Sequence, residues 1–540
     1  MPAGLRLRAD HGTRLIAGGS VLVGGSPVRV LRLTPAGGRQ VADWLAGTPL
    51  PSGAAARKLA RRLLDAGIAH PFFEAPGTCS ARAGSSPSSL EGTDPGDSDP
   101  ARARPGGVAV ETPPAGSQER PDVTVVIPVR DRHTELARCL AGLRACGAAG
   151  ALDGGSGLAV IVVDDASADP AAIAAIAARY GADVVHRPVN GGPGAARNTG
   201  LAAASTGLVA FLDSDCVPAP GWLDGLLPHF ADPAVGAVAP RIVAHEAGTG
   251  WLARYEGASS TLDMGARPSI VRPGARVSYV PGAALVVRRS AAGAGFAEGM
   301  FVGEDVDFVW RMSAAGWRVR YEPSAVMGHD HRVTFRAWFS RRADYGTSAA
   351  ALEQLHPGAV RPLYASWWTV GAWAAALSGR PVCAAVLTGT ATALLARRLS
   401  KVTGERWPVP ARPPDIRPPN TQDNSKKRRG AAWPLAVQLA GGGTLAAGRP
   451  LGSALSRTWW PVAIPAAIAF PGLRRPVAAL ILAPPLLDWA DRRPPLDPVR
   501  YVAARLLDDA AYSIGVWRGC AARRTLRPLL PVLGNRRPPA

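Results

Sequence analysis

Between residues 122 and 335, continuous apolar runs alternate with stretches whose apolar residues recur at helical spacing. The apolar runs suit strands buried on both faces, and they read VTVVIPV, LAVIVVDDAS, ADVVHRP and GLVAFLDSD. The stretches at helical spacing are TELARCLAGLRA, IAAIAARYG and PGAARNTGLAAA. Strands and helices that alternate in this way predict an α/β domain over 122–335, built on a mostly parallel sheet with helices on both faces.

Residues 1–74 predict a small α+β domain ahead of this one. Short runs indicate strands in LRLRAD, RLIAGG and RVLRLT, and two helices follow in GGRQVADWLAG and AAARKLARRLLDAGI. Gly67 is placed to end the second helix. Residues 75–121 are rich in Gly, Ser and Pro and bury too little apolar surface to offset the entropy of ordering them, so we expect a disordered linker.

After residue 335 the chain becomes apolar and rich in tryptophan. Most of the apolar runs are shorter than the ~20 residues that a spanning helix needs, so buried core helices are one interpretation. Tryptophans near the ends of the runs and arginines at their boundaries favour a membrane region, with the α/β domain on the cytoplasmic face. We expect amphipathic and apolar helices over 336–396, a basic cytoplasmic loop over 397–430, apolar membrane segments over 431–490 and a basic tail over 491–540.

The chain carries a formal net charge of +20, and almost all of its positive charge is arginine. Such a charge attracts phosphates, acidic lipid or nucleic acid. No basic helix interleaved with aromatic residues is visible, which argues against nucleic acid, whereas basic residues beside apolar segments favour a lipid surface. The six cysteines are scattered without a C-x-x-C pair, so we expect neither a disulfide framework nor a zinc site.

The FLDSD motif places Asp213, Ser214 and Asp215 directly after an apolar strand. Ligands of open parallel sheets bind at the carboxyl ends of the strands. The chain turns here, so one carboxylate can face a sugar or ribose while the other meets a divalent cation that also binds substrate phosphates. A solvated turn is the other interpretation of D-x-D taken alone.

Two further motifs suit a nucleotide. Asp165 ends the VIVVDDAS strand and can accept a hydrogen bond from a ribose hydroxyl or a base edge, or it can cap the next helix, for which Ser167 and Asp169 are better placed. NGGPGAARNTG opens a helix with glycines, and Arg197 within it can bind a phosphate. The other interpretation of these glycines is structural, since tight strand-to-helix turns use the same residues without binding a phosphate.

The FVGEDVDFVWRM motif supplies a second acidic centre in Glu304 and Asp305. A carboxylate here can take the proton of an attacking hydroxyl, although acidic residues also stabilise a helix N-terminus by themselves. GHDHR offers His329 and His331, which can ligate a metal, bind a diphosphate or lie in a surface turn.

These motifs, in this order, resemble the inverting family-2 glycosyltransferases of GT-A fold. The resemblance implies a uridine diphosphate sugar as donor and Mg²⁺ or Mn²⁺ as cofactor. It places the donor beside Pro128, Val129, Arg130, Asp165, Arg197, Asp213 and Ser214, the metal at Asp215 with Asp213 and His329, and the catalytic base at Asp305 beside Glu304. The Q-x-x-R-W signature of processive members is missing from FSRRADYGTSAA, residues 339–350, which argues against long-chain polymerisation.

The whole chain resembles a subgroup, the mycofactocin-system glycosyltransferases, on DVTVVIPVRD, AARNTGLA, GEDVD and VSYVPGAALVVRRSA. This implies transfer of glucose, in β linkage and in several units, to a peptide-derived redox cofactor or its precursor. The chain is expected to differ from the subgroup in a longer tail, near 401–430 and after 490. The first 70 residues resemble a peptide-recognising winged-helix domain, or they form a domain that merely packs on the catalytic unit.

Two other functions stay open at this point. A membrane polysaccharide or glycolipid sugar transferase would have the same fold. A non-catalytic nucleotide-sugar-binding protein would be free to lose carboxylates, which the intact Asp213, Asp215 and Asp305 argue against.

Overall fold

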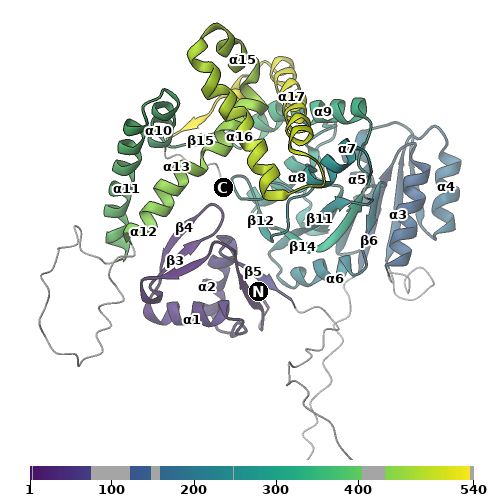
Figure 1. The fold of residues 1–540 in the computed structure, drawn as a ribbon. Coiled ribbons are helices and arrows are strands. Elements are labelled where there is room, and N and C mark those ends of the chain that lie inside the picture. Colours follow the sequence, from purple (N-terminus) through teal and green to yellow (C-terminus); the bar gives the residue numbers. More distant parts are fainter. Residues whose placement is uncertain (3, 74–121, 147–157, 247, 404–431, 535–540) are drawn as a thin grey trace, which may run out of the picture.

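The apolar runs of the α/β domain, residues 122–335, form the parallel half of its central sheet (Figure 1). The computed structural model describes residues 1–2, 4–73, 122–146, 158–246, 248–403 and 432–534. The predicted strands are β6 (Val123–Val129), β7 (Ala159–Asp165), β8 (Asp183–Arg187) and β9 (Leu208–Leu212). All three pairings among them are parallel, in the order β9-β6-β7-β8, as the pattern predicts.

The other half of the sheet is mixed, which corrects the expectation of a mostly parallel sheet. β13 (Ala284–Arg288) runs antiparallel to both β9 and β11 (Val235–Ala244). β14 (Arg318–His329) is parallel to β11, whereas β10 (Cys216–Pro218) and β12 (Ser269–Val271) pair with β14 in the antiparallel direction. The reason is positional: β13 begins at Ala284 beside Leu212, the carboxyl end of β9, and must run back from that edge.

Helices cover both faces of this sheet. Side chains of β6 alternate between the faces, so that Val125 and Ile127 pack with α3 and α4 while Val126 packs with α5 and α8. The helices are α3 (His133–Ala145), α4 (Pro170–Arg179), α5 (Gly192–Ala203), α6 (Trp222–Leu226), α7 (Trp251–Ser259) and α8 (Glu304–Ala314). The carboxyl ends of β6, β7 and β9 remain accessible at one edge.

The N-terminal residues fold around an apolar core of their own, which includes Val41, Trp44 and Leu63. The strands are β1 (Arg6–Ala9), β2 (Arg14–Ile16), β3 (Val21–Gly24), β4 (Arg29–Arg32) and β5 (Ala69–Phe72), and the helices are α1 (Pro35–Leu45) and α2 (Ala54–Asp65). The sequence pattern had not indicated β3 and β5. Gly67 follows α2 with a φ of 65°, as its predicted role at the end of that helix requires.

Several ion pairs fasten the N-terminal domain to the α/β domain, and two of them are bidentate. Arg61 pairs with Asp232 through two hydrogen bonds, of 2.5 and 2.7 Å. Arg318 binds both carboxylate oxygens of Asp65, with the longer bond at 2.8 Å. This packing is consistent with a domain that merely packs on its neighbour, and peptide recognition by the N-terminal domain stays a prediction. The predicted linker 75–121 lies outside the described residues.

The C-terminal third is helical, and part of it belongs to the catalytic unit (Figure 1). α17, in yellow, packs along α9. The predicted basic tail therefore contains a long helix, while residues 404–430 of the predicted basic loop lie outside the described residues. The main helices are α9 (Phe335–Leu355), α10 (Trp367–Leu377), α11 (Pro381–Thr403), α12 (Ala432–Ala436), α14 (Gly448–Ala454), α15 (Trp460–Ala469), α16 (Arg474–Arg492) and α17 (Pro498–Ala522).

Small residues bring the backbones of α9 and α17 into direct contact. A Cβ atom on Gly515 would lie 1.9 Å from the carbonyl oxygen of Ala343, and one on Gly519 would lie 2.5 Å from that of Thr347. Beside this contact, Arg342 of α9 forms an ion pair of 3.1 Å with Asp508 of α17, and both side chains are buried. α17 is thus held by close packing and by paired charges.

We predict that Gly515→Ala destabilises the protein by about 1–3 kcal/mol, because the added methyl must push two helix backbones apart. The measurement is the free energy of unfolding from thermal or urea denaturation. Gly257→Ala in α7 is the control, since a Cβ there meets nothing within 4 Å and alanine favours the helix. Equal stability of the two variants would contradict the packing described.

Candidate functional site

A cavity of about 1000 Å³ opens at the carboxyl ends of the parallel strands. Its lining comes from strand ends, from the start of α5 and α8, and from α9 and the C-terminal helices. With the exception of His331, the structure brings together in this one cavity the site residues that the sequence singled out for donor, metal or catalysis: Pro128, Val129, Arg130, Asp165, Arg197, Asp213, Ser214, Asp215, Glu304, Asp305 and His329.

The two carboxylates of FLDSD face different partners. Asp213 follows β9, its backbone N–H donates to the Ala283 carbonyl at 2.9 Å, and its carboxylate binds Arg197 at 2.7 Å. Asp215 instead pairs with Arg132 and lies 3.5 Å from His329. Because the chain turns between them, the two carboxylates at this strand end bind different side chains.

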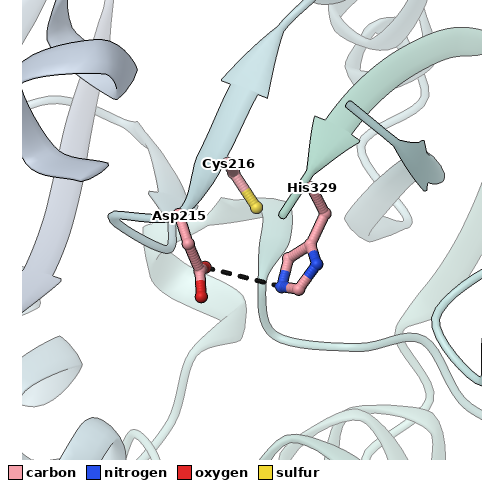
Figure 2. A group of neighbouring side chains, drawn as sticks. All are labelled: Asp215, Cys216 and His329. Carbon is pink, nitrogen blue, oxygen red and sulfur yellow. Dashed lines mark ion pairs between the residues drawn. The ribbon is translucent and has the colours of Figure 1, made fainter. Parts of the chain in front are cut away.

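Asp215 and His329 form a candidate metal site together with Cys216 (Figure 2). The ligand atoms of the three residues lie within 4.8 Å of one another, because Cys216 of β10 is paired across the strands with His329 of β14. Without a bound ion, burial raises the pKa of the Cys216 thiol far above its ordinary value. The carboxylate of Asp215 and the imidazole of His329 are ligands that suit Mn²⁺ or Mg²⁺ completed by substrate oxygens.

The charge state of Asp215 fits this role. Burial by itself would raise its pKa, but His329 and Arg132 outweigh burial and hold the pKa below the ordinary value. Asp215 is therefore ionised at neutral pH. The Nδ1 atom of His329 is buried and has no hydrogen-bond partner among the described residues. His331, the other histidine of GHDHR, does not line the cavity, and burial and the nearby His329 lower its pKa to about 4.

Arg132 is a site residue that the sequence did not reveal. Its guanidinium pairs with Asp215, and although burial acts to lower its pKa, Asp215 and then Asp213 raise it above the ordinary value. The residue lies just after β6, where an arginine in RDR carries no distinguishing pattern. It places a fixed positive charge beside the candidate metal site.

Arg197 lies between two acids. Its side chain is only 3% exposed, and it binds Asp213 at 2.7 Å and Glu304 at 2.9 Å. Burial opposes its charge, but Asp213 and Glu304 raise its pKa well above the ordinary value. In this structure the guanidinium that was expected to bind a phosphate holds two carboxylates in place.

Glu304 and Asp305 begin α8, directly after Gly303, whose φ of 84° turns the chain into the helix. Glu304 is buried against Arg197, and burial and then the charge of Asp305 raise its pKa. Asp305 accepts hydrogen bonds of 2.8 Å from the backbone N–H groups of Gly282 and Val306. It has no ion-pair partner among the described residues, whereas the neighbouring Glu304 is paired with Arg197.

Asp165 shapes the start of α5. Its carboxylate accepts from the backbone N–H groups of Gly191 and Gly192 at 3.0 and 2.8 Å, and from Arg187 at 2.8 Å. The alternative role as a cap of α4 is wrong, because Asp169 caps that helix through the Ala172 N–H at 3.0 Å.

The cavity also contains residues from beyond the catalytic domain. Arg341 and Tyr345 come from α9, Arg457 from the π-helical segment η7 (Leu455–Trp459) and Tyr512 from α17. Sequence reasoning missed them because it assigned everything after 335 to membrane helices, a loop or a tail. No local pattern distinguishes these residues, which reach the site only through the packing of α17 on α9.

Comparison with known proteins agrees with this site. Residues 124–293 match the family model described as glycosyl transferase family 2. The chain is 38% identical over 541 residues to the pre-mycofactocin glycosyltransferase of Mycobacterium tuberculosis, and the match covers 98% of each chain. It is 28% identical over 240 residues to an N-acetylglucosaminyltransferase of Rhizobium meliloti, covering 42% of this chain and 55% of that protein.

Among solved structures, a mannosyltransferase of Pyrobaculum calidifontis in complex with GDP-Man and Mn²⁺ aligns with 53% of this chain and 80% of its own. The identity is 22% and the TM-score 0.34, and we draw nothing about this chain from a likeness of that size.

The coverage of the mycobacterial relative corrects one expectation. Because the match extends over 98% of both chains, the basic insert and the stretch after 490 are not a departure from the subgroup. With that extent of identity, and with the family match over β6, β7, α5 and β9 at one side of the cavity, the chain belongs to glycosyltransferase family 2, in the group of the pre-mycofactocin glycosyltransferases.

Proposed function

We propose that this glycosyltransferase moves glucose from a uridine diphosphate sugar to pre-mycofactocin, a peptide-derived redox cofactor precursor, in β linkage and one or several units at a time. The single observation that carries the proposal is the cavity in which Asp213, Asp215, Glu304 and Asp305 converge. The printed name of a relative that is 38% identical over almost the whole chain supports the choice of acceptor.

The donor side of the proposed site is the edge formed by β6, β7 and β9. Pro128, Val129 and Arg130 end β6, where they can lie along the base and ribose. Asp215 and His329 would hold Mg²⁺ or Mn²⁺, with Asp213 nearby, and the ion would stabilise the charge of the departing diphosphate. Arg132 adds a second positive charge at the same place.

The acceptor side is the start of α8. Asp305 accepts the proton of the acceptor hydroxyl while the oxygen of that hydroxyl forms a bond to the anomeric carbon. The bond between that carbon and the diphosphate oxygen breaks on the opposite side, so that uridine diphosphate leaves and the configuration inverts. Glu304 is a positioning residue, since its carboxylate is held by Arg197 at 2.9 Å.

Asp305→Asn is expected to lower the rate of transfer roughly a hundred- to ten-thousand-fold, the usual contribution of a general base. The fold should survive, because an asparagine oxygen can still accept from the Gly282 N–H. The measurements are steady-state transfer from UDP-glucose to pre-mycofactocin, and calorimetric binding of UDP, which should be unchanged.

Glu304→Gln is the comparison for that variant, since it removes a charge from the neighbouring position. It should cost less in rate than Asp305→Asn, because Glu304 orients Arg197 and takes no proton. Transfer by Asp305→Asn at nearly the wild-type rate, with saturating acceptor, would assign the base elsewhere. A wild-type enzyme that glycosylates a lipid but not pre-mycofactocin would favour the glycolipid transferase.

Asp215→Asn is expected to weaken UDP binding in the presence of Mn²⁺ by at least about tenfold, because a charged metal ligand is lost. Isothermal calorimetry with Mn²⁺ and with a chelator gives the two affinities to be compared. Asp183→Asn, an exposed aspartate at the start of β8, is the control and should bind as the wild type does. Equal affinity of the wild type with metal and with chelator would contradict the metal role.

We also propose that the C-terminal helices hold the protein at the cytoplasmic face of the cell membrane. Among the described helices, Pro381–Lys401 of α11 is long and apolar enough to cross a membrane, and only 17% of it is buried. Large apolar side chains are exposed on α10, α11, α15 and α16, which include Trp367, Val382, Val386, Val462, Ile468 and Leu486. Exposed apolar side chains in this number suit contact with lipid.

Replacing Val382 and Val386 by Asp should lower binding to phospholipid vesicles by about tenfold or more, because each change removes apolar contact and buries a charge in lipid. Both side chains are exposed, at 74% and 62%, so folding should be unaffected. Vesicle flotation measures the bound fraction, with Val28→Asp in the N-terminal domain as the control. Wild-type protein that stays in solution beside vesicles would contradict the proposal.

A further inference from the structure

The cavity lining includes a group of tyrosines and arginines that have no part in the chemistry proposed above: Tyr279, Arg341, Tyr345, Arg457 and Tyr512. Only Tyr279 lies within the catalytic domain. The other four come from α9, η7 and α17, so helices far along the chain contribute side chains to the same cavity as the acids.

In two pairs among these residues, an arginine lies over a tyrosine ring. The Cζ atom of Arg341 is 4.8 Å from the centre of the Tyr345 ring, and that of Arg457 is 4.4 Å from the centre of the Tyr512 ring. Both distances are within the range of cation–π attraction. The first pair lies one turn apart on α9, whereas the second joins η7 to α17. Stacking therefore fixes flat, polar surfaces inside the cavity.

These surfaces lie around the candidate base. Burial and then the charge of Asp305 raise the pKa of Tyr279 to about 12. Tyr512, Arg457 and Tyr345 also act on the pKa of Tyr279, so each of them is within electrostatic reach of that phenol. The site of proton transfer is thus bordered by phenol rings and guanidinium groups.

Backbone contacts fix this arrangement. A Cβ on Gly303, which precedes α8, would lie 2.8 Å from the Cβ of Ser348 on α9. A Cβ on Gly346 of α9 would lie 2.1 Å from the carbonyl oxygen of Tyr512 on α17. The three helices therefore meet with very little tolerance, and their cavity-lining side chains have little freedom to shift.

The polar groups of this cluster remain available to a ligand. Among the described residues, the hydroxyls of Tyr279 and Tyr512 have no hydrogen-bond partner, and Arg341 has no ion-pair partner. Arg457 has only a distant carboxylate partner, Asp509 at 3.7 Å. Free hydroxyls and weakly engaged guanidinium groups at fixed positions are the features of a polar binding surface.

We propose that Tyr512 and Arg457, together with Tyr279, Arg341 and Tyr345, form the acceptor subsite of this transferase and bind a ring-bearing hydroxyl compound. The inference rests on the proposed function, which places the acceptor hydroxyl beside Asp305. Rings stack on phenol and guanidinium planes, and the phenol hydroxyls hold the polar groups of the acceptor. The donor phosphates belong at the strand ends, beside Arg132 and His329.

The test is a comparison of Michaelis constants for pre-mycofactocin and for UDP-glucose in Tyr512→Ala and Arg457→Ala. Each variant should raise the acceptor KM about tenfold or more, since a stacking surface is lost. The donor KM and the affinity for UDP with Mn²⁺ should change less than about twofold, because neither residue contacts the donor. Arg518→Ala, an exposed arginine on the same helix outside the cavity, should match the wild type.

Two conservative substitutions, Tyr512→Phe and Arg457→Lys, test the subsite if the alanine variants do not fold. Tyr512→Phe keeps the ring and should raise the acceptor KM less than Tyr512→Ala, while Arg457→Lys keeps the charge and loses the plane. An acceptor KM unchanged in Arg457→Lys and Tyr512→Phe would overturn the subsite, as would an equal rise in donor KM. A wild type that hydrolyses UDP-glucose but never glycosylates pre-mycofactocin would overturn the proposed function and the subsite together.

Discussion

The arrangement of the site depends on one buried cation. Arg197 of α5 binds Asp213 after β9 and Glu304 at the start of α8, and so ties three elements together at the edge of the cavity. Leaving a buried charge without its partner costs about 3–5 kcal/mol, so the two acids and the arginine stabilise one another only as a set. With Glu304 fixed in this way, the neighbouring Asp305 points into the cavity and remains without a counter-ion among the described residues.

Much of the catalytic domain could be predicted from the sequence, because its strands and helices are defined by local periodicity. β6, β7, β8 and β9 are long apolar runs, and their parallel order follows from the helices between them. The mixed half could not be predicted in the same way. β13 and β14 have ordinary strand sequences, and their directions depend on where the preceding loops enter the sheet. β3 was missed because its four residues are all buried and show no alternation, and β5 because its sequence AHPF contains a proline.

The site residues also fall into those that a local sequence pattern indicated and those that only the tertiary structure brings together. Residues that follow buried strands, such as Asp165, Asp213 and Asp215, were found because the carboxyl edge of a sheet is where ligands bind. Their neighbours Arg132 and Cys216 were missed, since their importance comes from a side chain across the turn or across the strand. Arg457 and Tyr512 were beyond reach of any local pattern, as only the close approach of α17 to α9 brings them to the cavity.

That approach also sets when the enzyme becomes complete during its synthesis. Tyr345 leaves the ribosome well before Tyr512, and translation proceeds at about 5–20 residues per second, so the interval is on the order of ten seconds or more. The apolar segments between them emerge in the meantime. A nascent chain can therefore fold its nucleotide-binding half early, yet it has no finished cavity until α17 docks. The cavity is thereby complete only in molecules whose chain has been made and assembled as far as α17.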